Sequence, residues 1–298
     1  MFSSISFPPQ TPLVAGDFVK IDMGCHIDGF IAVTAHTIIV ASGDAPVELP
    51  APEAGDVAVA CHTAMRVASA MIRPGNKNSD VTKAVEAVAD AYGVKCMANV
   101  KMHQMKQFVM DGKKEIALAK PNPDMDEAKV EAVEFEDHEV YAIDIVMSTG
   151  KGEGREGDDR TTVFKRNVET KYSLKKDTSR TLLNEITQKS GVMAFTTRSV
   201  TEERTAKAGI IECVAHNLFS QYPVFNERAG TYVAHFKTTL MLLPGGNKMA
   251  TGAPLPPYFT SEKVLGEEEA AILKAEEERE AKAAAKKAAK KAKKNKKK

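Results

Sequence analysis

An aspartate and a valine near the start of the chain decide which metal chemistry this segment can support. Residues 16–40 form two apolar-rich runs joined by Asp28-Gly29, which is a strong signal for a β-hairpin with a two-residue turn. Such a turn places Asp22 and Val33 on one face as diagonal neighbours, about 7–8 Å apart. Two carboxylates at these positions could share a pair of metal ions. Valine offers no ligand atom, so we expect this face of the hairpin to lack one of the two carboxylate ligands.

The predicted turn also determines which residues of the hairpin face each other. Ile27 opposes Phe30, Gly24 opposes Val33, and Asp22 opposes Ala35. Side chains alternate between the two faces of a strand, so apolar residues share one face of the first strand. They are Val19, Ile21, Met23, Cys25 and Ile27.

Further segments resemble one known group of proteins in order and spacing over residues 13–260. Besides the hairpin they are residues 73–82, 102–104, 139–144, 148–152, 160–165, 178–180 and 232–237. The chain resembles type 2 methionine aminopeptidases, and more closely their non-peptidase relatives, the proliferation-associated, ErbB-binding protein family. This resemblance implies an α+β fold of the pita-bread (creatinase/methionine-aminopeptidase-like) type. We expect an irregular segment at 1–12, in place of a longer N-terminal part, one domain at 13–262 and a charged tail at 263–298.

The resemblance implies where the metal ligands of the peptidases fall in this chain. An aspartate ligand falls on Asp22, the histidine ligand on His103, and a glutamate ligand on Asp144. The two ligands that bridge the metal ions fall on Val33 and Lys237. A histidine that contacts the substrate falls on Asp111.

These replacements predict a protein without peptidase activity, metal or cofactor. A buried carboxylate needs a cationic partner or it takes up a proton, and the Lys237 ammonium can be that partner. We therefore predict a salt bridge from Lys237 to Asp22 or Asp144 in a vestigial site. Two alternatives remain open: a single weakly held metal on Asp22, His103 and Asp144, and a residual metal-dependent methionine aminopeptidase.

Other motifs do not support a competing activity. Residues 152–157 match G-x-G-x-x-G, but a strand pattern follows them where a dinucleotide site needs a helix. The sequence has neither H-E-x-x-H nor G-x-S-x-G. Its four cysteines are scattered, without C-x-x-C spacing, and indicate reduced thiols.

Apolar periodicity predicts the elements that position these residues. Helices are expected at 53–72, 78–92, 177–189 and 201–219, and strands at 139–147, 160–165 and 232–243. We expect the strands at 139–147 and 160–165 to form a second hairpin-like pair. Residues 121–136, rich in Pro, Asp and Glu, predict a surface loop.

Composition points to a globular protein of the cytoplasm and the nucleus or nucleolus. Of its 298 residues 43% are hydrophobic, and no run approaches the roughly 18 apolar residues of a membrane span. Residues 1–12 lack the basic start and apolar core of a secretory leader. We therefore expect no membrane partner.

The net charge of +1 hides an acidic body and a basic tail. Residues 281–298 carry ten lysines and no acid, so residues 1–280 carry 31 basic and 40 acidic residues. We predict a helix that becomes disordered along this tail, because it has few apolar residues to bury. The expected nucleic-acid contacts are Lys286, Lys287, Lys290, Lys291, Lys293, Lys294, Lys296, Lys297 and Lys298. A solubilising tail and binding to anionic membranes are the alternatives for this segment.

The resemblance and the tail together imply a function. We expect a catalytically inactive, ribosome- or RNA-associated regulator of translation, ribosome biogenesis and cell growth, with protein partners as well. A DNA-binding transcriptional regulator of the same family is the alternative.

Overall fold

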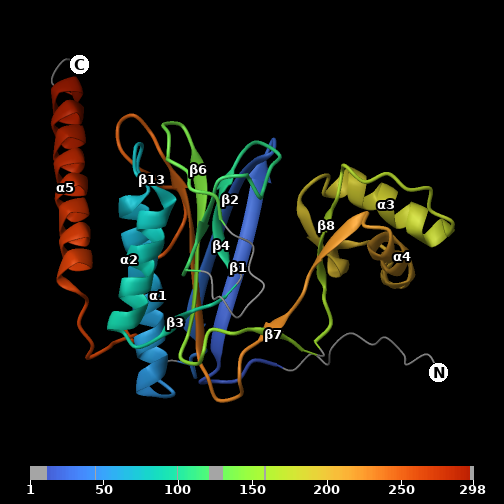
Figure 1. The fold of residues 1–298 in the computed structure, drawn as a ribbon, viewed down its shortest axis with the longest axis horizontal. Coiled ribbons are helices and arrows are strands. Elements are labelled where there is room, and N and C mark those ends of the chain that lie inside the picture. Colours follow the sequence, from blue (N-terminus) through green and yellow to red (C-terminus); the bar gives the residue numbers. More distant parts are fainter. Residues whose placement is uncertain (1–11, 44, 99, 121–129, 158, 296–298) are drawn as a thin grey trace. The chain divides into compact units, whose positions relative to one another are not determined.

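The chain divides into two compact units in a computed structural model (Figure 1). The structure describes residues 12–43, 45–98, 100–120, 130–157 and 159–295; for residues 203, 205 and 287–295 it describes the backbone alone. Residues 14–106, 111–153 and 227–298 form the main unit. Among the described residues, those at 12–13, 107–110 and 154–226 form the inserted unit.

The main unit is built on one antiparallel sheet. Its strands are β1 (Phe18–Ile27), β2 (Phe30–Ile39), β3 (Lys95–Cys96), β4 (Lys101–Met105), β5 (Glu115–Ala117), β6 (Val140–Ser148), β12 (Val233–Met241) and β13 (Lys248–Met249). The order across the sheet is β1-β2-β12-β6-β4-β5, with β3 on β6 and β13 on β12. Strands from both ends of the chain therefore meet at its centre, where β2 lies next to β12.

The β1–β2 hairpin has the predicted register. Ile27 pairs with Phe30, Gly24 with Val33, and Asp22 with Ala35. The turn residues Asp28 and Gly29 have φ angles of 51° and 82°. Positive φ at both central positions is the signature of a type I′ turn, which explains why Asp-Gly is found here.

Two helices, α1 (Pro52–Met71) and α2 (Asn78–Ala91), form the main core with the sheet (Figure 1). Both were predicted from their apolar stripes. Ile143 and Ile145 of β6, together with Phe236 of β12, are buried in this core. Asp144 and Lys237 are adjacent in sequence to these residues, so alternation puts them on the opposite face. The helices thus cover one face, and the polar residues lie on the other.

The C-terminal segment forms one long helix, α5 (Glu267–Asn295), in agreement with the helix predicted for the start of the tail. Alanine and lysine have high helix propensity, and acids at the start with bases at the end suit the helix dipole. Ile272 and Leu273 pack against the main core. Arg66 of α1 and Arg73, two residues after the end of α1, form salt bridges with Glu277 and Glu276 of α5. The acidic part is therefore docked rather than fully exposed.

The inserted unit has its own elements and its own core. They are β7 (Arg155–Glu156), β8 (Val163–Arg166), α3 (Asp177–Lys189), β9 (Ala194–Thr196), the 3-10 helix η1 (Thr197–Ser199), α4 (Glu203–Ala215), β10 (Phe219–Tyr222) and β11 (Phe225–Asn226). The predicted pairing of the strand at 160–165 with the strand at 139–147 is wrong. β8 pairs with β9 and β10 instead. Phe164 of β8 is buried with Phe195 and Phe219, and this local burial decides the pairing.

Candidate functional site

One row of residues crosses four strands on the sheet face opposite α1 and α2. Lys237 of β12 pairs with Asp144 of β6 on one side and with Ala35 of β2 on the other. Ala35 in turn pairs with Asp22 of β1. Residues directly opposite each other in a sheet point to the same face. Three charged residues from distant parts of the sequence thus converge.

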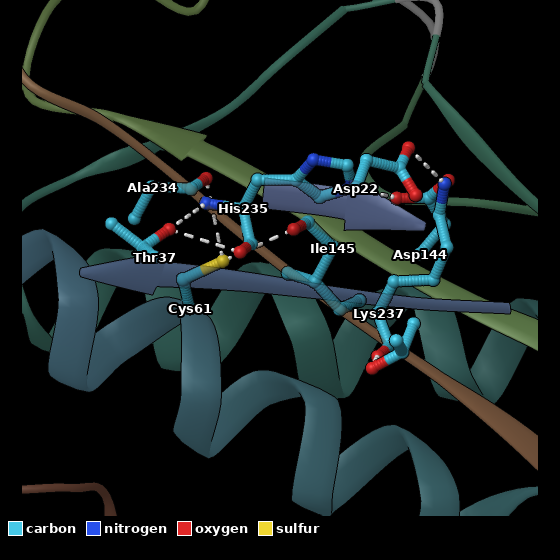
Figure 2. A network of polar contacts seen from close by, with 9 residues as sticks. Asp22, Thr37, Cys61, Asp144, Ile145, Ala234, His235 and Lys237 are labelled. Carbon is cyan, nitrogen blue, oxygen red and sulfur yellow. Dashed lines mark hydrogen bonds and ion pairs between the residues drawn. The ribbon is translucent and has the colours of Figure 1, made fainter. Parts of the chain in front are cut away.

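The Lys237 ammonium lies between the two carboxylates (Figure 2). Its Nζ is 2.8 Å from Asp22 Oδ2 and 2.8 Å from Asp144 Oδ2. The predicted salt bridge is confirmed, and it joins Lys237 to both aspartates at once. The side chains of Lys237 and Asp144 are only 13% and 15% exposed, whereas that of Asp22 is 49% exposed. The pair with Asp144 is therefore the one shielded from water.

His235 completes this cluster, although we did not predict a role for it. Its Nε2–H donates a hydrogen bond of 2.7 Å to Asp144 Oδ1 (Figure 2). The two oxygens of Asp144 thus have different partners, His235 and Lys237. The signal was present in the sequence, because His235 precedes Lys237 by two residues and a strand places such residues on one face. We call Asp22, Asp144, His235 and Lys237 the ion cluster.

Burial and charge act in opposite directions on the ion cluster. Burial alone would raise the pKa of Asp144, but the His235 hydrogen bond and the Lys237 charge hold it below its ordinary value. Burial alone would lower the pKa of Lys237, but the charges of Asp144 and Asp22 raise it. Asp144 and Lys237 are therefore both held in their charged forms at neutral pH.

The ion cluster spans the weakest backbone connection of the sheet. Among the residues described, β2 and β12 share a single ladder pair, Lys237 with Ala35. On either side of this pair, two threonine hydroxyls bridge β2 and β12 in place of backbone ladder hydrogen bonds. Thr37 Oγ1 accepts from His235 N at 2.8 Å and donates to His235 O at 2.9 Å. We call this junction the threonine seam.

The second threonine of the seam repeats this arrangement. Thr239 Oγ1 accepts from Val33 N at 2.8 Å and donates to Val33 O at 3.0 Å. Val33 is thus held by backbone contacts across the seam, and its side chain offers no polar atom to the ion cluster. Sequence reasoning missed both threonines, because nothing in a local pattern marks a hydroxyl as a substitute for a ladder bond.

The remaining predicted site residues lie at different places. His103 of β4 pairs with Ala142 of β6, two residues before Asp144. Its Nδ1 is buried and has no hydrogen-bond partner in the described part of the protein. Asp111 is exposed in the connection between β4 and β5. The lysine side chains predicted to contact nucleic acid are described only for Lys286, which is exposed on α5.

The described side chains do not fit a pair of metal ions. No group of three or more His, Cys, Asp or Glu residues within the described ranges has the geometry to hold a metal. An ammonium group occupies the space between the carboxylates, and it can replace a metal's charge but cannot polarise water as a Lewis acid. The arrangement can hold strands together and can offer hydrogen bonds to a partner.

Comparison with known proteins agrees with the fold. A model described as metallopeptidase family M24 matches residues 3–163. ErbB-3 binding protein 1 from Solanum tuberosum is 48% identical over 247 residues, which are 83% of this chain and 61% of the relative. A curved DNA-binding protein from Schizosaccharomyces pombe is 35% identical over 264 residues, which are 88% of this chain and 67% of the relative.

A solved structure shows the same fold. The structure of a thermophilic Arx1 is 26% identical and superposes with a TM-score of 0.79, covering 88% of this chain and 75% of that chain. The chain spans 61% of the length of its Solanum tuberosum relative. Within the described ranges, no helix is both long and apolar enough to cross a membrane.

Proposed function

This chain belongs to metallopeptidase family M24, and we propose that it is a member without peptidase activity that associates with ribosomes or RNA. In that role it regulates translation, ribosome biogenesis and cell growth. The pita-bread scaffold serves as a binding platform, and the lysine-rich tail supplies attraction to phosphate groups.

The position of Lys237 is the observation that supports the absence of peptidase activity. An M24 peptidase of the methionine aminopeptidase type uses a metal pair to generate hydroxide and to stabilise the transition state. The family resemblance implies that the two bridging ligands fall on Val33 and Lys237. The Lys237 Nζ already satisfies both aspartates at 2.8 Å. A metal ion placed there would have to displace an ammonium group and would lack both bridging oxygens.

A peptidase assay tests the absence of peptidase activity directly. The purified chain, supplied with Mn²⁺ or Co²⁺, is incubated with a peptide that begins with methionine. We expect no release of methionine with either ion. Release that a chelator abolishes would contradict the proposal and would favour the alternative of a residual metallo-aminopeptidase.

The lysine-rich tail supports the proposed association with ribosomes or RNA. Ten lysines within residues 281–298 can neutralise phosphates and release counterions. Without arginine or aromatic residues among them they provide attraction but little base recognition. This favours the charged surface of a large RNA over one specific sequence. The family resemblance adds the expectation of ribosome association.

A DNA-binding role is the second candidate, because one relative is named a curved DNA-binding protein. Co-sedimentation with ribosomes distinguishes ribosome or RNA association from DNA binding. The full chain is compared with a chain lacking residues 281–298 and with a full-length control in which the ten lysines are glutamines. We expect only the full chain to sediment with ribosomes, and excess duplex DNA to compete poorly. Equal competition by duplex DNA would favour the DNA-binding role.

The salt dependence provides a further check. If the tail contacts about six phosphates, the affinity should fall by roughly a thousandfold between 50 and 200 mM salt. The glutamine control should show almost no dependence. A wild-type affinity that is insensitive to salt would exclude the tail as the main contact.

A further inference from the structure

The outer edge of β1 carries no paired strand in the described part of the main unit. β1 has ten residues and pairs with β2 on one side only; no other strand of the described chain pairs with it. Apolar side chains accompany this edge on the helix-bearing face of the sheet. Met23, Ile27 and Phe30 are 60%, 78% and 65% exposed, and Ile21 is 38% exposed. Exposed edges of this kind recruit further strands.

The hairpin geometry determines which backbone groups face outward. Ile27 and Phe30 close the two-residue turn and are bonded to each other. In an antiparallel ladder, bonded and non-bonded positions alternate along each strand. The odd-numbered residues of β1 therefore direct their N–H and C=O groups to β2. The even-numbered residues from Phe18 to His26 direct theirs to the outer edge.

The residues of β1, together with the turn residue Asp28 that follows the strand, form a pattern that is complementary to itself. It is symmetric about Gly24: Lys20 and Asp28 lie four positions on either side, and Asp22 and His26 lie two positions on either side. If two copies pair antiparallel with Gly24 opposite Gly24, each Lys20 faces Asp28 of the second copy. Each Asp22 likewise faces His26 of the second copy, whose ring N–H can donate a hydrogen bond to the carboxylate. The opposite charges of Lys20 and Asp28 directly across the ladder are also favourable.

The other face of β1 is complementary in the same register. Ile21 faces Ile27 of the second copy, and Met23 faces Cys25 of the second copy. The even-numbered residues pair with even-numbered ones, so the outward backbone groups of Asp22, Gly24 and His26 find partners in β1 of the second copy. One strand pairing therefore satisfies backbone, charge and apolar contacts together.

Neighbouring registers are less favourable. A slip of two residues in one direction puts Asp22 opposite Asp28 of the second copy, and it does so twice because the pair is symmetric. A slip of two residues in the other direction puts Lys20 opposite His26 and leaves Asp22 opposite Gly24. A slip of one residue mixes apolar and charged residues on each face.

We propose that this chain forms a two-fold symmetric dimer in which β1 pairs antiparallel with β1 of a second copy, centred on Gly24. The two sheets then continue into one another. An edge-to-edge contact buries less area than the roughly 1,200 Å² of a standard interface. We therefore expect a dissociation constant in the micromolar range, about 1–100 μM.

A charge exchange between two variants tests the register. Lys20→Glu places two Glu–Asp pairs in its own dimer, and Asp28→Lys places two Lys–Lys pairs in its own. A mixed dimer of the two variants contains only opposite-charge pairs. Analytical ultracentrifugation should show each variant dimerising about tenfold more weakly than the wild type, with recovery on mixing. Lys248→Glu, an equal charge change on exposed β13, should dimerise as the wild type does.

Recovery on mixing distinguishes lost pairing from lost folding, because an unfolded variant cannot be rescued by another. Failure of the mixture to recover, with both variants folded by circular dichroism, would overturn the register. A wild-type chain that stays monomeric at several hundred micromolar would overturn the dimer itself.

Disulfide trapping tests the same register independently. Met23→Cys places a thiol opposite the exposed Cys25 of the second copy, at a non-bonded pair with Cα atoms about 4.5 Å apart. Oxidation should give a covalent dimer, in which mass spectrometry finds the introduced thiol joined to Cys25 of the second copy. Ile27→Cys, which faces Ile21 of the second copy, is the matched control and should cross-link much less.

Hydrogen exchange identifies any other occupant of the edge. In the dimer, the amides of Lys20, Asp22, Gly24 and His26 should become protected as concentration rises. Protection of these amides in a monomer would show that another segment of the same chain covers the edge, and it would overturn the proposal.

Discussion

The Lys237 ammonium has two carboxylate partners, so its removal affects more than one interaction. Asp144 would keep its His235 hydrogen bond but would lose the positive charge that balances it. A shielded charge left without its partner costs far more than an exposed one. The ion cluster therefore makes sharp predictions for single substitutions.

We predict that Lys237→Met lowers the free energy of unfolding by about 3 kcal/mol at pH 7, because it leaves a shielded carboxylate unbalanced. Urea denaturation measures the change. The control is Lys248→Met, which removes an exposed lysine and should change stability by less than about 0.5 kcal/mol. An equal, small effect of both substitutions would mean that the ion cluster contributes little.

The pH dependence of stability follows from the same shifts. Asp144 has a lowered pKa, so its contribution is complete above its ordinary value of 3.8 and is lost as pH falls through the lowered value. Lys237 has a raised pKa, so its contribution is complete below its ordinary value of 10.5 and is lost as pH rises above that value. In Lys237→Met the alkaline loss should shrink, and Asp144 should take up its proton at a higher pH than in the wild type. Denaturation curves between about pH 2 and 11 would reveal both changes.

The assignment of Val33 and Lys237 to the bridging positions predicts a gain of function. The double variant Val33→Asp, Lys237→Glu removes the ammonium and adds two carboxylates to the face that carries Asp22 and Asp144. We expect isothermal titration calorimetry to detect Mn²⁺ or Co²⁺ binding to the double variant but not to Val33→Asp alone. Absence of binding by a folded double variant would contradict the assignment.

At the scale of elements, the threonine seam joins β2, from the N-terminal hairpin, to β12, more than 190 residues later. Its strength depends on side-chain hydroxyls, since one ladder pair alone connects the two strands in the described chain. The ion cluster lies over this seam and reaches both neighbouring strands, β1 and β6. Hydroxyls and charges together therefore hold the two halves of the sheet.

Thr37→Val should lower the free energy of unfolding by about 1–3 kcal/mol, because it leaves the N–H and C=O of His235 without a partner in a buried place. Thr34→Val is the matched control, since within the described ranges the Thr34 hydroxyl donates a single, longer hydrogen bond of 3.3 Å, to Lys237 O. Thermal or urea denaturation compares the two. A seam that does not depend on hydroxyls would give equal effects.

At the scale of the whole molecule, each unit has a separate hydrophobic core. Charge is also divided unevenly. Residues 154–226 carry 12 basic and nine acidic residues, whereas residues 281–298 carry ten lysines and no acid. Because the two hydrophobic cores are separate, damage to one core should leave the other unit's core intact.

We predict that Leu182→Ala, at a fully buried position of α3, destabilises the inserted unit by about 2–5 kcal/mol. Hydrogen exchange should then accelerate in α3 and α4 but not in β6 and β12. Val168→Ala, at a half-exposed position of the same unit, is the control. Faster exchange in β6 and β12 as well would show that the two units unfold together.

Local patterns were enough to predict much of this protein. An Asp-Gly turn determines the pairing of its flanking strands, so the β1–β2 register followed from sequence. Apolar stripes identified α1, α2 and α3, because burial of one helix face repeats every 3.6 residues. The salt bridge of Lys237 followed from charge balance once the resemblance had assigned the positions.

Only the tertiary structure decided which distant strands meet. The place of β8 beside β9 and β10 depends on Phe164, Phe195 and Phe219 packing together, and no local signal encodes that contact. His235 and Thr37 acquire their roles only because β12 lies between β2 and β6. Sequence determines what a residue can do chemically, but long-range pairing determines which partner it finds.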